Sequence, residues 1–145
     1  HGDAERTAFA GLELVPFELT AELTRLAVME ILPAVLSGRF IDFASGITAY
    51  GKLAGKPFER ASSRLPYAGA TARLFEWLDL QGVKGFAQSS WGPAVVAACE
   101  SSVDADSLVS AAEAAGISEQ HEIRVIAFDN NGAIVREIEE SSTSV

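Results

Sequence analysis

The densest group of side chains that could do chemistry lies near the middle of the chain, in residues 85–95. This run combines two hydroxyls, an amide and an indole with a rigid Gly-Pro turn. Hydroxyl and amide groups can donate hydrogen bonds to an oxyanion, and backbone N–H groups of a Gly-containing loop can converge on it. The indole can cover an aromatic ring or a sugar face. The candidate substrate-binding residues are therefore Gln88, Ser89, Ser90, Trp91 and Gly92.

The same run also fits a turn with a purely structural role. Serine hydroxyls can satisfy neighbouring backbone groups in a bulged hairpin, and Trp91 could fill the core. Residue types alone leave both interpretations open.

Other polar groups carry weaker signals. Four basic residues within residues 52–64 could bind phosphate, but a solvated helix end and loop is the favoured interpretation. His121 has no His, Cys or paired carboxylate at ligand spacing, so we expect no metal site. The sequence has no Gly-rich dinucleotide fingerprint and no phosphate-loop motif, and no catalytic residue can be assigned. The basic residues are Lys52, Lys56, Arg60 and Arg64.

Composition limits the classes of partner. The chain of 145 residues fits one domain, and its formal net charge of −9 argues against nucleic acid and anionic membrane as partners. A small anionic ligand needs only a local donor cluster and stays possible.

Cys99 is the only cysteine, so no internal disulfide can form. A reducing, cytoplasmic location is expected, and no apolar stretch predicts a transmembrane span.

Three helices are expected before the polar run. The first begins at Thr20 and ends near Gly38, with a kink or break at Pro33. The second covers Phe40 to about Ala54, where Gly55 and Pro57 stop it. The third helix runs from about Pro66 to Gln81. The second helix carries an apolar stripe along one face. The stripe is formed by Phe40, Phe43, Ile47, Tyr50 and Ala54.

Strands are expected on both sides of the polar run and near the end of the chain. Short apolar segments at 83–88 and 94–100 flank the turn, and Asp104 caps a fourth helix. Segments 122–128 and 133–138 are joined by an Asp-Asn-Asn-Gly sequence that is typical of a hairpin. This order predicts an α+β domain with a four-stranded, mostly antiparallel sheet and helices packed on one face.

Residues 82–93 closely resemble a motif of the beta-ribofuranosylaminobenzene 5'-phosphate synthase family, which is related to the GHMP kinases. Weaker similarity near the start of the chain and at residues 32–34 and 55–58 extends the resemblance over nearly the whole chain. The resemblance implies a ferredoxin-like fold of the GHMP kinase C-terminal domain type for residues 1–145. An N-terminal phosphate-loop domain would then be missing from this chain.

The resemblance also implies an activity. Enzymes of the family are pentosyltransferases that condense phosphoribosyl pyrophosphate with a para-substituted benzoate in methanopterin-type cofactor biosynthesis. Residues 88–92 would line a cleft against the missing N-terminal domain, with Ser89 and Ser90 donating to phosphate or carboxylate oxygens and Trp91 shaping the wall. No cofactor is expected on this chain, although Mg²⁺ would accompany phosphoribosyl pyrophosphate or ATP in a full-length protein.

Two further functions stay open from the sequence. The chain could be the C-terminal domain of a GHMP-type small-molecule kinase, or a non-catalytic module for ligand binding or dimerisation. We expect no turnover from the isolated chain under any of these readings. Substrate and oligomeric state, including a possible homodimer, are not assigned by the sequence.

Overall fold

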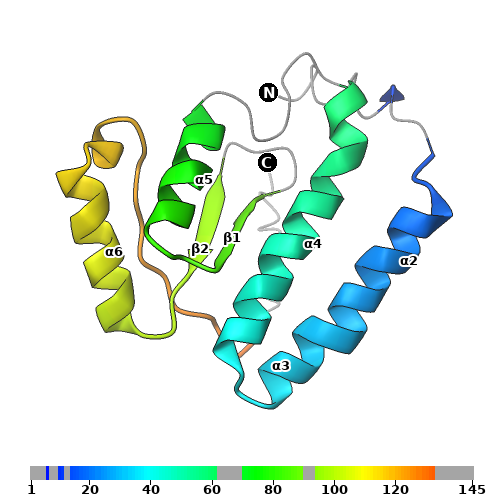
Figure 1. Ribbon diagram of the computed structural model, residues 1–145, viewed down its shortest axis with the longest axis horizontal. Helices are drawn as coiled ribbons and strands as arrows, with labels where there is room; N and C mark the ends of the chain where they lie inside the picture. The colour runs from blue at the N-terminus through cyan, green and yellow to red at the C-terminus, as the bar shows by residue number, and fades with distance from the viewer. Residues whose placement is uncertain (1–5, 7–9, 12–13, 62–69, 90–93, 133–145) are drawn as a thin grey trace, which may run out of the picture.

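A computed structural model describes residues 6, 10–11, 14–61, 70–89 and 94–132. Figure 1 shows a pair of long helices on one side, a two-stranded hairpin with a shorter helix beside it, and a last helix on the other side. Helices dominate the described residues, and none of them is both long and apolar enough to cross a membrane.

The first long helix is continuous but changes its winding. It consists of α2 (Phe17–Arg25), the π-helical segment η1 (Leu26–Ile31) and α3 (Leu32–Leu36). The helix begins directly after Pro16, earlier than the expected start at Thr20. Pro33 does not end it: proline lacks an N–H and clashes one turn back, and the turn before it is wound as a π-helix. The chain stays helical, with wider winding, where a kink or a break was expected.

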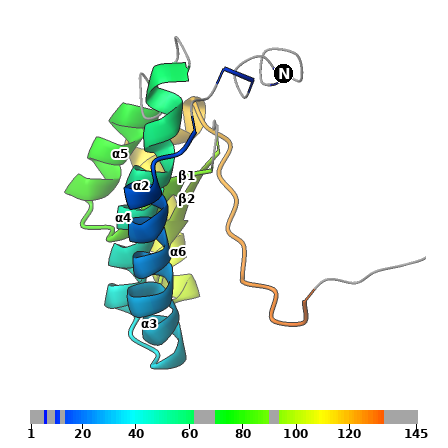
Figure 2. The ribbon, with the colours of Figure 1, turned by 90° about the vertical axis from the view of Figure 1, so that its right-hand side faces the viewer.

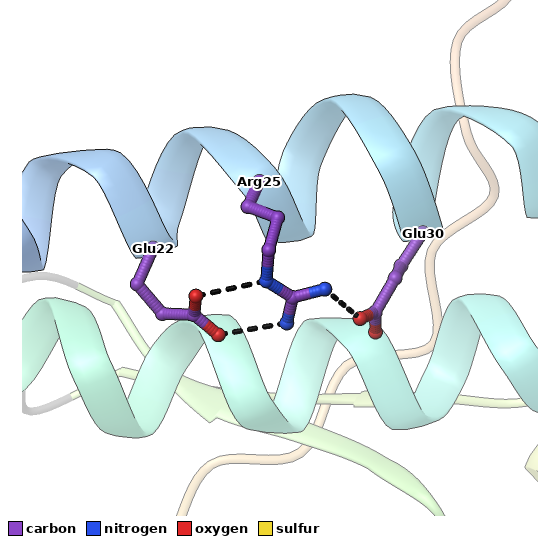
Figure 3. A network of polar contacts seen from close by, with 3 residues as sticks. All are labelled: Glu22, Arg25 and Glu30. Atoms are coloured by element: carbon purple, nitrogen blue, oxygen red, sulfur yellow. Dashed lines mark hydrogen bonds and ion pairs between the residues drawn. The ribbon is translucent and has the colours of Figure 1, made fainter.

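An ion network spans this change of winding (Figure 3). Arg25 donates from Nε and Nη2 to the two carboxylate oxygens of Glu22, at 2.8 and 2.7 Å, and from Nη1 to Glu30 at 2.6 Å. Glu30 follows Arg25 by five residues, the spacing of the backbone hydrogen bonds of a π-helix. Hydrogen bonding from Arg25 holds the pKa of Glu22 below its ordinary value, and the pKa of Arg25 is raised.

The second long helix, α4 (Phe40–Ala61), runs antiparallel to the first. It is longer than predicted, because neither Gly55 nor Pro57 stops it. The predicted apolar stripe is half-buried or exposed, and the buried positions of α4 belong instead to small residues. A Cβ at Gly46 would lie 2.7 Å from Cγ1 of Ile31, so the two helices approach closely there. The buried residues of α4 are Ala44, Gly46, Gly51 and Gly55.

The hairpin packs between α4 and α5 (Ala70–Leu80). Strands β1 (Gly85–Gln88) and β2 (Val95–Ala98) pair antiparallel, as the sequence predicted, with Gly85 opposite Ala98. The rings of Phe75 on α5 and Phe86 on β1 lie 5.0 Å apart between centroids. Phe86 is only 6% exposed, so it joins the hairpin to the core.

The helix after the hairpin, α6 (Ser102–Ala114), starts from a different cap than expected. Ser101 is the N-cap: its Oγ accepts from the backbone N–H of Asp104 at 3.2 Å and donates to the carboxylate of Asp104 at 2.7 Å. Asp104 therefore lies at the third helical position, where its negative charge interacts favourably with the positive end of the helix dipole. The short 3₁₀ helix η2 (Ile117–Glu119) follows.

The predicted strand at 122–128 does not form. These residues are exposed and belong to no helix or strand, and Figure 2 shows the segment passing to one side of the hairpin. The turn after it does form: the N–H of Asn131 bonds to the Asp129 carboxylate at 2.8 Å. The predicted partner strand at 133–138 lies outside the described residues. Turn chemistry is local, whereas a strand needs a partner for its backbone groups.

The fold prediction is therefore wrong. The four-stranded, mostly antiparallel sheet of the ferredoxin-like, GHMP kinase C-terminal domain type is not present among the described residues. Their sheet has two strands, β1 and β2, within a helix-rich structure.

Candidate functional site

The structure places part of the predicted polar run at one end of the hairpin. Gln88 is the last residue of β1 and is half-buried, and Ser89 follows it with an exposed side chain. The backbone N–H of Ser89 donates to the carbonyl of Ala94 at 2.8 Å, which closes the hairpin. The remaining candidates, Ser90, Trp91 and Gly92, lie outside the described residues.

The side chain of Ser89 is exposed and directly follows the last residue of β1. Its hydroxyl makes no hydrogen bond with another described residue. A serine that only satisfied its own turn would bond to a nearby backbone group. The residues of the turn to which it could bond, 90–93, lie outside the described residues, so the binding and structural interpretations of Ser89 both stay open.

The opposite edge of β1 is held by a helix rather than by a third strand. Oγ1 of Thr48 on α4 accepts from the N–H of Phe86 at 2.9 Å. The same hydroxyl lies 2.7 Å from the carbonyl oxygen of Lys84 and 3.0 Å from that of Phe86. A hydroxyl has one proton, so it donates to one of these carbonyls at a time. Thr48 thus fixes β1 to α4 at the point where the strand begins.

Close packing of small residues supports this attachment. A Cβ placed on Gly85 would lie 2.8 Å from Cβ and 2.9 Å from Cα of Ala44, and 3.0 Å from Cβ of Ala98. Ala44 is fully buried. Only glycine allows β1 to lie this close to α4, so the strand that ends in Gln88 has a fixed position.

The basic residues that the sequence placed at a helix end and loop lie largely within a helix. Lys52, Lys56 and Arg60 all belong to α4, because the helix continues through Pro57. Arg64 is outside the described residues. The expected arrangement is therefore corrected for Lys56 and Arg60, which lie on the helix and not beyond its end, whereas Lys52 lies on the helix as predicted.

The single cysteine follows β2 and is half-buried. Burial, with a smaller contribution from the charge of Asp104, raises the pKa of the Cys99 thiol. A raised pKa keeps the thiol protonated at neutral pH, and a protonated thiol is a poor nucleophile. The raised pKa makes Cys99 a weaker candidate for nucleophilic catalysis than an ordinary exposed thiol.

No group of three or more His, Cys, Asp or Glu side chains that could hold a metal ion is found in the described part of the chain. His121, after η2, is half-buried there.

Thr48 was missed by the sequence analysis. It lies in the interior of a predicted helix, where threonine usually points to solvent or bonds back to the preceding turn. A signal was present in the small residues around it, since Ala44, Gly51 and Gly55 share one face of the helix with Thr48 at spacings of three and four.

Comparison of the chain with protein-family models, with curated proteins and with solved structures gave no match.

Proposed function

We propose that this chain is the C-terminal domain of a pentosyltransferase, and that the end of the β1–β2 hairpin forms one wall of its substrate cleft. The exposed side chain of Ser89, at the end of a strand fixed by α4, is the observation that supports this best. The proposed reaction is that of the synthase family, because residues 82–93 resemble a motif of that family.

The residues of this chain would bind and orient a phosphorylated sugar. The hydroxyls of Ser89 and Ser90 would donate to phosphate or carboxylate oxygens, the amide of Gln88 would fix a hydroxyl group, and Trp91 would shape the wall. In the reaction of the family, phosphoribosyl pyrophosphate and a para-substituted benzoate join with loss of carbon dioxide and pyrophosphate. Mg²⁺ would accompany the pyrophosphate in the full-length protein.

The opposite wall of the cleft would come from an N-terminal domain of the same polypeptide. The reacting atoms need both walls, so the isolated chain would bind substrate weakly and would not turn it over. A reducing, cytoplasmic setting suits a chain whose single cysteine has no intramolecular partner.

A ligand-stabilisation experiment tests the proposal. Phosphoribosyl pyrophosphate at ten times its Kd should stabilise the chain by about 1.4 kcal/mol, which raises the Tm by a few degrees. ATP at the same concentration and ionic strength should not. A shift with ATP alone would indicate a GHMP-type kinase, and no shift with either compound would indicate a module with another ligand.

Serine variants assign the effect to the hairpin. Ser89→Ala and Ser90→Ala should each reduce the stabilisation by phosphoribosyl pyrophosphate while leaving the Tm of the free chain nearly unchanged. Ser110→Ala is the matched control, because its hydroxyl bonds only to the carbonyl of Asp106 on the exposed face of α6. If both hairpin variants bind as the parent does, the serines have a structural role and the proposed cleft is wrong.

A further inference from the structure

A hollow lies at the other end of β1, between α4, α5 and the start of the strand. It encloses about 340 Å³ and opens to solvent, at the lower limit of the range found for small-molecule sites. Four of its lining residues lie on one face of α4 at spacings of three and four. The lining is formed by Ser45, Thr48, Ala49, Lys52, Asp79, Val83, Lys84 and Phe86.

Two of the three lysines of the chain, Lys52 and Lys84, line this hollow. Neither ammonium group makes an ion pair or a hydrogen bond with a described residue. Arg25 and Arg39, in contrast, are engaged by neighbouring carboxylates. In a chain with a net charge of −9, two lysines at one hollow, without an ion pair among the described residues, give that hollow a local positive charge that would attract an anion.

The positions of the two lysines are set by the packing of their elements. Oγ1 of Thr48 lies 2.7 Å from the backbone carbonyl of Lys84, and Lys52 is one turn further along the same helix. Lys84 also directly precedes Gly85, which is packed against Ala44. The backbones that carry the two ammonium groups are therefore held together before any ligand arrives, which lowers the entropic cost of binding.

The rest of the lining narrows the class of ligand. Val83 and Ala49 provide apolar wall that suits a short carbon skeleton, and Ser45 adds a hydroxyl. The carboxylate of Asp79 lies on the same hollow without an ion pair to either lysine. It would repel a second anionic group and would accept a hydrogen bond from a ligand hydroxyl.

We propose that this hollow binds the oxyanion group, carboxylate or phosphate, of a compact hydroxylated molecule between Lys52 and Lys84. The site is separate from the proposed cleft at the hairpin end: Lys84 and Gln88 are four residues apart along an extended strand, or about 13 Å. Variants of one site can therefore be tested without touching the other.

A pair of matched probes distinguishes the two sources of the oxyanion. Glycerate and glycerol 3-phosphate share a hydroxylated three-carbon skeleton and differ in the acidic group. Each is titrated into the ¹⁵N-labelled chain at constant ionic strength, with sodium chloride as the reference. Saturable shifts of the backbone amides of Thr48, Lys52 and Lys84 support the site, and the tighter probe identifies the oxyanion. No saturable shift with either probe would overturn the proposal.

Charge variants test the two lysines. Lys52→Gln and Lys84→Gln should each weaken binding of the tighter probe roughly fivefold, the effect of losing one partly exposed charge partner. Lys56→Gln is the matched control, since it removes the same charge from α4 at an exposed residue outside the lining. An equal loss in all three variants would mean a general charge effect and would overturn the site.

Two further variants complete the design. Asp79→Asn should tighten binding of the anionic probes severalfold, because it removes a negative charge from the hollow with little change in shape. Weaker or unchanged binding would contradict the arrangement. Ser89→Ala should leave binding in the hollow unchanged, so a failure of this site and a failure of the proposed cleft can be told apart.

Discussion

The hydroxyl of Thr48 on α4 accepts a hydrogen bond of 2.9 Å from the backbone N–H of Phe86 on β1. In an antiparallel pair, alternate residues direct their backbone groups to opposite sides of the strand. Phe86 faces away from β2, on the edge where a third strand would bind. A side chain of a helix therefore satisfies a group that the edge of a sheet usually leaves unpaired.

The first prediction is that Thr48→Val destabilises the protein by about 1–3 kcal/mol. Valine keeps the shape of the side chain but leaves the N–H of Phe86 without its partner, and an unsatisfied, part-buried donor costs this much. Urea unfolding followed by circular dichroism measures the loss.

Thr24→Val is the control for this substitution. Its hydroxyl bonds to the carbonyl of Thr20 on an exposed helix face, at 2.9 Å, where water can replace it. The expected change is within about 0.5 kcal/mol. Equal losses at the two positions would show that the Thr48 hydroxyl does not hold the strand.

The second prediction concerns the close approach of β1 and α4. Gly85→Ala should cost about 1–3 kcal/mol, because the new methyl group would lie 2.9 Å from the Cα of Ala44, a backbone atom that cannot rotate away. The midpoint of urea denaturation reports the change.

A double variant identifies the source of this strain. Adding Ala44→Gly removes the Cβ that would lie 2.8 Å from the new methyl group, but not the Cα. The loss from Gly85→Ala should therefore be smaller in the Ala44→Gly background than in the parent. Identical losses in both backgrounds would place the strain elsewhere.

The third prediction is a pH dependence at the Arg25 network. The guanidinium of Arg25 lowers the pKa of Glu22 in the folded protein. A lowered pKa contributes stability that is present above the unfolded pKa and is lost as the pH falls through the folded pKa. In the variant Arg25→Gln, the pKa of the Glu22 carboxyl should rise toward its ordinary value, as followed by NMR titration.

The matched control is Arg39→Gln, because Arg39 pairs with Asp42 and is not part of the network with Glu22. It should leave the titration of Glu22 unchanged. High salt should weaken the effect of Arg25, since the groups are exposed and the interaction is screened. A Glu22 titration that is the same with and without Arg25 would contradict the network shown in Figure 3.

Elements whose signals lie within a few residues could be predicted from the sequence. The hairpin around the polar run is present as predicted, with β1 and β2 antiparallel. Helix α6 and the turn at Asp129 formed where their capping and turn residues indicated, although the cap is Ser101. These features depend on groups that are near neighbours in the chain, so the sequence contains most of the information.

The wrong predictions concern elements whose structure depends on contacts with a distant segment of the chain. Helix α4 continues through Gly55 and Pro57, although proline removes one hydrogen bond of the helix. Two of its small residues, Ala44 and Gly46, lie against β1 and η1. Residues 122–128 are rich in β-branched and aromatic residues but have no strand partner among the described residues, and so the expected four-stranded sheet is absent there.

For the candidate site, the sequence alone determined which groups are available: the amide of Gln88, the hydroxyls of Ser89 and Ser90, and the indole of Trp91. Only the tertiary structure showed that Thr48 fixes β1 to α4, and that Lys52 and Lys84 line one hollow. The physical reason is sequence separation. Thr48 and Phe86 are 38 residues apart, and no local preference reports a contact that forms only when α4 packs against the hairpin.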